Sequence, residues 1–148
     1  MVDVREQILA RLLEVVADIP GIRSAHRNNN DITAEQLPAA IVFDGDEETV
    51  TADALSRHAP GSNGVVQMTP EIVIAEQTVG QVGSELTVLR RELIKGVLFD
   101  PQLVSIVKPP NGTIWYLGCQ TDVGWMRSMH GALLAQFVFK YSLKPGDL

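Results

Sequence analysis

The sequence predicts a single α+β domain, in which a mainly antiparallel or mixed sheet of about four to five strands carries two main α-helices. Two segments repeat apolar residues at intervals of three and four, which is the spacing of one helix face. Other segments alternate between apolar and polar residues or run continuously apolar, as strands do. Turn residues separate these segments, and long strands joined by turns favour antiparallel pairing.

The first helix is predicted at residues 3–18. Its apolar stripe comprises Val4, Ile8, Leu12, Val15, Val16 and Ile19. Asp3 is placed to cap this helix, and Glu6 occupies the position of a capping-box partner. Pro20 and Gly21 are expected to end it.

The next elements are expected to be strands and loops. A short strand is predicted at residues 22–27 and a loop at 28–31, where asparagine side chains compete for local backbone hydrogen bonds. The apolar run at 37–43 predicts a buried strand. The acidic residues at 44–48 predict a turn, and the pattern then dissolves. We expect a mobile loop insertion over residues 44–64, with its most loop-like composition near Gly64.

Strand character resumes at residues 65–77, where Pro70 predicts an edge position or a bulge. Residues 79–98 predict the second helix, with Thr78 or Ser84 as a possible cap. Its apolar stripe comprises Val82, Leu86, Leu89, Leu93 and Val97. A short turn is expected from Asp100 to Val107.

Two strands complete the predicted domain, at residues 113–121 and 130–143. In the second of them one set of alternate side chains is continuously apolar: Leu133, Ala135, Phe137, Phe139, Tyr141 and Leu143. Because aromatic residues suit a half-buried pleated surface, we expect this strand to cross the centre of the sheet. Pro145 and Gly146 are expected to end it.

Composition narrows the classes of function. The chain has 148 residues, a net charge of −6 and a sequence pI of about 4.9. This negative charge argues against nucleic-acid binding, in which clustered lysine and arginine side chains neutralise the phosphates. The one cysteine, Cys119, allows no intramolecular disulfide. Neither a signal peptide nor a membrane-spanning run is recognisable, so we expect a soluble protein made in the cytoplasm.

No motif in the sequence predicts catalysis, a cofactor or a metal. His26, His58 and His130 do not stand at metal-ligand spacing from one another or from Cys119. Gly80 and Gly83 precede a helix, but neither the P-loop lysine nor the dinucleotide-binding glycine triplet accompanies them. We therefore expect a structural or assembly role, with no catalytic, cofactor-binding or metal-binding residues.

Three interpretations apply to the acidic run formed by Asp44, Asp46, Glu47 and Glu48. Its carboxylates suit a hard divalent cation, although the EF-hand spacing is absent. A solvated turn after a buried strand is the simpler reading. A negatively charged rim on an assembled ring is the third.

The order of motifs resembles the minor tail proteins of long-tailed bacteriophages, in particular the tail terminator or tail completion family. The motifs are the Ile19-Pro20-Gly21-Ile22 stop, the Leu37-Pro38-Ala39 start of an apolar strand, and the aromatic strand through Phe137-Val138-Phe139-Lys140-Tyr141. The resemblance spans nearly the whole chain and implies a compact domain of helices packed on a sheet. It carries no catalytic motif.

The resemblance also implies a function. Such proteins form a hexameric ring that caps the tail tube, stops its polymerisation and joins it to the head-completion complex, with DNA passing through the lumen. The implied partners are other copies of the chain, the tail tube protein and the head-completion or connector protein. The implied location is the head–tail junction of the virion.

The residues we expect at an interface between subunits or with partners are Asp44, Asp46, Glu47, Glu48, Trp125 and Met126. Two alternative functions stay open on the sequence. One is a head–tail connector or head-closure protein of the same particle. The other is a small ligand-binding or enzymatic domain, which a deep pocket lined by convergent polar groups would favour.

Overall fold

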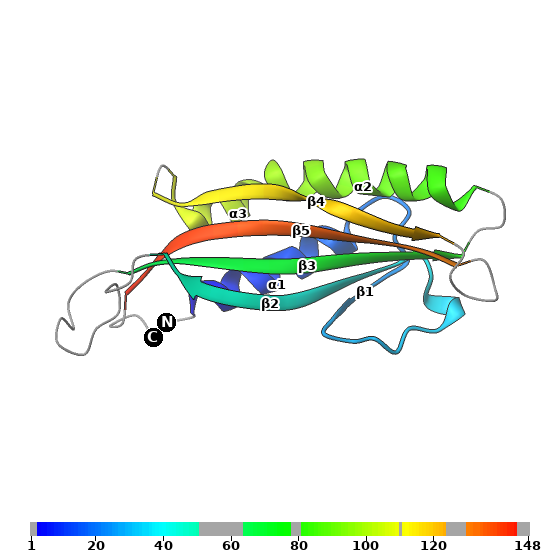
Figure 1. Cartoon of the computed structure of the whole chain (residues 1–148), viewed down its shortest axis with the longest axis horizontal. Helices are drawn as coiled ribbons and strands as arrows, with labels where there is room; N and C mark the ends of the chain where they lie inside the picture. Colours follow the sequence, from blue (N-terminus) through cyan, green and yellow to red (C-terminus); the bar gives the residue numbers. More distant parts are fainter. Residues whose placement is uncertain (1–2, 51–63, 78–80, 110, 124–129, 145–148) are drawn as a thin grey trace.

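The computed structural model describes residues 3–50, 64–77, 81–109, 111–123 and 130–144 (Figure 1). Its elements are α1 (Val4–Ala17), β1 (Ser24–Arg27), the 3₁₀ turn η1 (Ala34–Gln36), β2 (Ala39–Thr49), β3 (Gly64–Gln77), α2 (Val82–Leu98), α3 (Pro101–Val107), β4 (Thr113–Val123) and β5 (His130–Leu143). The order of helices and strands matches the sequence prediction. The residues predicted as a short turn before Lys108 form the helix α3.

The five strands form one mixed sheet in the order β1-β2-β3-β5-β4. β1 pairs with β2 in parallel, and the other three pairs are antiparallel. The helices pack against one face of the sheet (Figure 1). This arrangement confirms the predicted α+β fold. β5 lies between β3 and β4, beside the middle strand, so the strand expected at the centre is an interior one.

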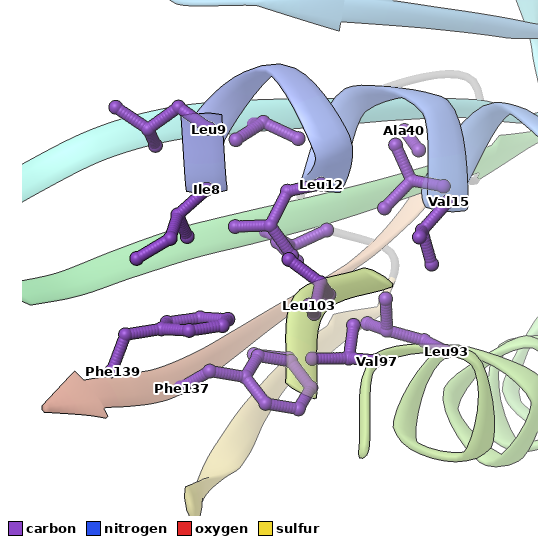
Figure 2. Close-up of a cluster of buried hydrophobic side chains, with 14 of the residues drawn as sticks. Ile8, Leu9, Leu12, Val15, Ala40, Leu93, Val97, Leu103, Phe137 and Phe139 are labelled. Carbon is purple, nitrogen blue, oxygen red and sulfur yellow. The ribbon is translucent and has the colours of Figure 1, made fainter. Parts of the chain in front are cut away.

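A single hydrophobic core lies between the helices and the sheet. α1 contributes Ile8 and Leu12 to it, while Phe137 and Phe139 project from β5 to meet Leu103 of α3 (Figure 2). All six apolar side chains predicted on one face of β5 are buried. None of the helices in the described ranges is long and apolar enough to cross a membrane.

The ends of α1 largely follow the sequence prediction. The Asp3 carboxylate accepts a hydrogen bond from the Arg5 backbone N–H at 3.0 Å, which is the expected cap. Glu6 instead accepts two hydrogen bonds from Arg27 of β1, so this side chain ties the helix to the sheet. The chain turns away from the helix at Gly21, where φ is +96° and glycine is favoured.

The acidic residues predicted as a turn at 44–48 belong to β2, which continues to Thr49. A bulge interrupts its pairing with β3 between Phe43 and Asp46. The bulge lies opposite Pro70, which has no backbone N–H to offer the ladder. Of the two alternatives predicted for Pro70, the edge position is wrong because β3 is an interior strand, and the bulge is confirmed, with the extra residue in the partner strand β2.

Because β2 extends to Thr49, the predicted insertion over residues 44–64 contains strand at both ends. Residues 51–63 of that insertion lie outside the described ranges. The second predicted helix begins at Val82 instead of residue 79. Gln81 occupies the N-cap position of α2 without a side-chain hydrogen bond, and Ser84 lies within the helix.

Candidate assembly surface

One face of the sheet has no described helix packed on it, and we call it the open face. Side chains on this face alternate with those of the core. The pairing register places Ile41 of β2, Val73 of β3 and Leu134 of β5 side by side across it. The open face is therefore a surface built by the central strands together.

Much of the open face is apolar. Its apolar members are Ala39, Ile41, Phe43, Val73, Ala75, Ala132, Leu134, Val138 and Trp115. Ile41 and Val138 are only 4% and 3% exposed. Trp115, on the edge strand β4, is 49% exposed. The most accessible apolar group of this surface therefore lies at its β4 edge.

The end of the open face that contains the last residues of β2 is polar and charged. One cross-strand row aligns Glu48, Gln67, Lys140 and Thr113 across β2, β3, β5 and β4. The Lys140 ammonium lies 5.1 Å from the centroid of the Trp115 ring, within the range of a cation–π contact. Lys140 therefore leans toward β4 and away from the acidic end of β2.

Asp44, a predicted interface residue, is part of a three-residue ion network. The Arg27 guanidinium donates to both Asp44 carboxylate oxygens, at 2.8 and 3.1 Å, and to both Glu6 oxygens, at 2.7 and 2.9 Å. The hydrogen bonds from Arg27 lower the pKa of the Asp44 and Glu6 carboxyl groups. This network joins α1, β1 and β2, so Asp44 has a structural role within the subunit.

Glu47 lies on the helix-covered side of β2, where its carboxylate accepts a hydrogen bond from the Tyr141 hydroxyl. Burial and the neighbouring Glu47 carboxylate raise the pKa of Tyr141 well above its usual range. Asp46 and Glu48 alternate with Glu47 and face the opposite side of the sheet. The predicted acidic cluster is thus divided between the two faces, with Asp46 and Glu48 on the open face.

The other candidate residues are not brought together at one site. Trp125, Met126 and His58 lie outside the described ranges. The His26 Nε2 lies 2.9 Å from the Ser24 Oγ, and Cys119 is a half-buried free thiol beside the core. Within the described part of the chain, no three histidine, cysteine, aspartate or glutamate side chains group as metal ligands.

Two hollows on the helix side of the molecule are the places to examine for the alternative ligand-binding function. A hollow of about 360 Å³ lies between α2 and the end of α1, lined by Pro20, Gly21, Glu76, Ser84, Glu85, Val88 and Leu89. A neighbouring hollow of about 410 Å³ extends to Phe99 and the Arg11–Asp100 ion pair. Among the described residues that line the two hollows there is no histidine or cysteine.

The sequence analysis did not include Trp115 and Lys140 among the candidate interface residues. Both were assigned only to strands, but their alternation was a usable signal. In β5, Lys140 alternates with the apolar core residues Phe139 and Tyr141, and alternate side chains of a strand face opposite sides of the sheet. Lys140 therefore faces away from the core. The cross-strand row that Lys140 shares with Glu48 depends on strand order, which periodicity does not reveal.

Comparison with known proteins gives a likeness in fold. No protein-family model matches the chain, and no curated protein matches it in sequence. A solved chain from the virion of a native gene transfer agent (GTA) particle is similar in structure, with a TM-score of 0.50. The two are 11% identical, and the match covers 94% of each chain. At this identity the match shows a shared fold.

Proposed function

We propose that this chain is a structural, non-enzymatic virion protein of a phage or phage-like particle, and that it acts as a tail terminator. In this role it forms a hexameric ring that caps the tail tube and stops its polymerisation. The ring joins the tube to the head-completion complex at the head–tail junction. The chain is made in the host cytoplasm and assembles into the virion.

The observation that carries this proposal is the likeness in fold to a chain of a gene transfer agent virion across 94% of both chains. A match of this extent involves the whole domain, helices and sheet together. The resemblance of the sequence motifs to tail terminators supports the same class of protein. The open face adds a surface suited to contacts between subunits, since it is apolar and ends in the half-exposed Trp115.

The charge of the chain is compatible with this role. DNA carries dense negative charge and binds proteins mainly through lysine and arginine contacts to its phosphates. A chain of net charge −6 offers the duplex weak non-specific attraction. In the proposed ring, DNA passes through the lumen without being held there.

The first test is the solution mass of the purified protein by light scattering, with negative-stain images of the same sample. We expect a mass near six subunits and a ring with a central hole wide enough for a DNA duplex. The second test adds the protein to purified tail tubes that are still able to elongate. We expect the protein to bind one tube end and to stop elongation.

A head-closure protein is the second candidate, because the likeness to a virion chain does not specify a position in the particle. The tube experiment separates the two functions. A ring that binds isolated portal or head-completion proteins and leaves tube elongation unchanged would favour head closure. A protein that forms no ring and binds neither tubes nor head proteins would contradict both functions.

A further inference from the structure

The sheet has unpaired strand segments on both edges of the same end. β1 pairs with β2 only along Ala39–Val42, so in the described part of the chain no strand lies outside Asp46–Thr49. On the opposite edge, β5 is the one strand that pairs with β4 among the described residues. An unpaired strand edge exposes backbone donors and acceptors and is a template for pairing with another chain.

The backbone groups of the β2 edge point outward at identifiable residues. The Val50 N–H donates to the Val65 oxygen at 2.8 Å. In an antiparallel pair, residues that bond the partner strand alternate with residues that do not. The N–H and C=O groups of Glu47 and Thr49 therefore point away from β3, toward the outer edge.

The two edges differ in charge. The β2 edge contains Asp46, Glu47 and Glu48, whereas β4 contains no charged residue from Thr113 to Thr121. Lys140 lies one strand inward from β4, with its ammonium over Trp115. Charged residues are a common device that keeps an edge strand from pairing, and this part of β4 has none.

The register of the sheet shows how the two edges fit. Three successive antiparallel pairings connect β2, β3, β5 and β4, so β4 runs opposite to β2. A β2 edge added beside β4 in a second copy would thus pair antiparallel. If the cross-strand row continues, Glu48 of that copy lies beside Thr113 and two strand spacings from Lys140, about 10 Å between backbones. The two long side chains can span this distance.

We propose that β4 of one copy takes the Asp46–Thr49 segment of a second copy as an additional strand, with Glu48 of the second copy paired to Lys140. This inference rests on the proposed ring and identifies its contact between subunits. The contact joins two different surfaces of the chain. Such a heterologous contact repeats around an axis and closes into a ring when the rotation permits.

The bulge in β4 limits the length of this pairing. It lies between Tyr116 and Gly118, and bulges bend a strand and increase its twist. In the second copy, β1 begins to cover β2 at the corresponding level. The added pairing therefore places Asp46–Thr49 of one copy opposite residues 112–115 of the other, with Asp46 beside Trp115 and Thr49 beside Gly112.

The test reverses the two charges separately and together, using Glu48→Lys, Lys140→Glu and the double variant. Light scattering and negative stain measure assembly of each full-length protein. Each single reversal places like charges at the contact, so we expect association at least about tenfold weaker than wild type. The double variant restores opposite charges and should recover the ring. A one-to-one mixture of the single variants should also recover it, because an even-numbered ring can alternate them.

Matched variants distinguish this contact from general effects of charge. Glu35→Lys changes an exposed residue of η1, which precedes the opposite end of β2, and should leave assembly unchanged. Thr49→Pro removes an outward N–H while keeping the charge, and proline is tolerated on edge strands. We expect it to fold, as judged by circular dichroism, and to lose the ring.

The outcomes separate this contact from the proposed function. A wild-type ring that survives both single reversals and Thr49→Pro would overturn the β2–β4 contact and leave the ring intact. Single reversals that disrupt the ring without recovery in the double variant or the mixture would also overturn the pairing of Glu48 with Lys140. A wild-type chain that stays monomeric, alone and on tail tubes, would overturn both.

Discussion

The Arg11 guanidinium, on α1, donates two hydrogen bonds of 3.0 and 2.7 Å to the carboxylate of Asp100, the residue before α3. The Asp100 side chain is only 7% exposed, and its carboxylate also accepts the Leu103 backbone N–H at 2.9 Å, capping α3. Two helices far apart in the sequence are therefore joined at one carboxylate. Removing one partner of a buried ion pair destabilises the fold, because the remaining charge stays buried without compensation.

We expect Asp100→Ala to lower the free energy of unfolding by about 2–4 kcal/mol, because it removes the cap of α3 and leaves Arg11 without its buried partner. Urea denaturation followed by circular dichroism measures the change. Glu14→Gln is the control, since the Glu14 side chain is 65% exposed and also contacts Arg11. It should change stability by less than about 0.5 kcal/mol. Equal effects of the two variants would contradict this role of Asp100.

Stability should fall in acid through the arginine-bound carboxylates. Hydrogen bonds from Arg27 lower the pKa of Asp44, and those from Arg11 lower the pKa of Asp100. A carboxyl whose pKa is lower in the folded state stabilises the fold above its unfolded pKa, which is about 4. This stabilisation is lost as the pH falls below about 4 toward the folded-state pKa. Urea titrations from pH 7 to pH 2 should show a decline that is shallower in Asp100→Asn than in wild type.

The bulge in β2 should depend on Gly45. Its φ is +71°, and a Cβ built on it would lie 2.0 Å from the Thr69 carbonyl oxygen. Gly45→Ala should therefore cost about 3 kcal/mol of unfolding free energy, from backbone strain and the steric clash. Gly83→Ala is the matched control, because a Cβ there meets nothing within 4 Å and the residue lies in α2. It should be neutral or stabilise by up to about 1 kcal/mol.

Tyrosine ionisation should be delayed in the folded protein. Burial is the main cause that raises the pKa of both Tyr141 and Tyr116. A tyrosine whose folded pKa is raised stabilises the fold below its unfolded pKa, about 10, and this stabilisation is lost as the pH rises further. Ultraviolet titration should show tyrosinate appearing at higher pH in native protein than in urea. Ionisation of both tyrosines at the same pH in native protein and in urea would contradict the burial of Tyr141.

The existence and type of most regular elements were predictable because they depend on local patterns, whereas several of their ends were not. The helical stripe of α2 and the alternation in β5 each indicate a buried face, and both faces are buried in the structure. The acidic end of β2 was not predictable from its composition. Its partners are distant: Tyr141 lies 94 positions from Glu47, and Arg27 lies 17 from Asp44. Sheet order likewise follows from packing between segments, which sets the position of Pro70 in an interior strand.

The candidate surface was predictable only in part for the same reason. Asp46 and Glu48 were expected at an interface and do reach the open face, whereas Asp44 and Glu47 bind groups within the subunit. A run of acidic residues in sequence looks uniform, but a strand sends alternate members to opposite faces. Simple alternation would have placed Asp44, Asp46 and Glu48 on one face, and the bulge between Phe43 and Asp46 moves Asp46 and Glu48 to the face opposite Asp44.

Trp115 should contribute to assembly more than to folding. Trp115 is 49% exposed on the open face and is not part of the hydrophobic core, so Trp115→Ala should leave the subunit folded. At an interface, a large aromatic side chain commonly contributes 2 kcal/mol or more of binding energy, on the order of a thirtyfold change in association. Phe99→Ala is the matched control, since Phe99 is 76% exposed after α2, on the helix side of the molecule. Light scattering across a dilution series should show weaker assembly for Trp115→Ala and unchanged assembly for Phe99→Ala. If Phe99→Ala weakens assembly more than Trp115→Ala does, the contact between subunits lies on the helices and not on the sheet.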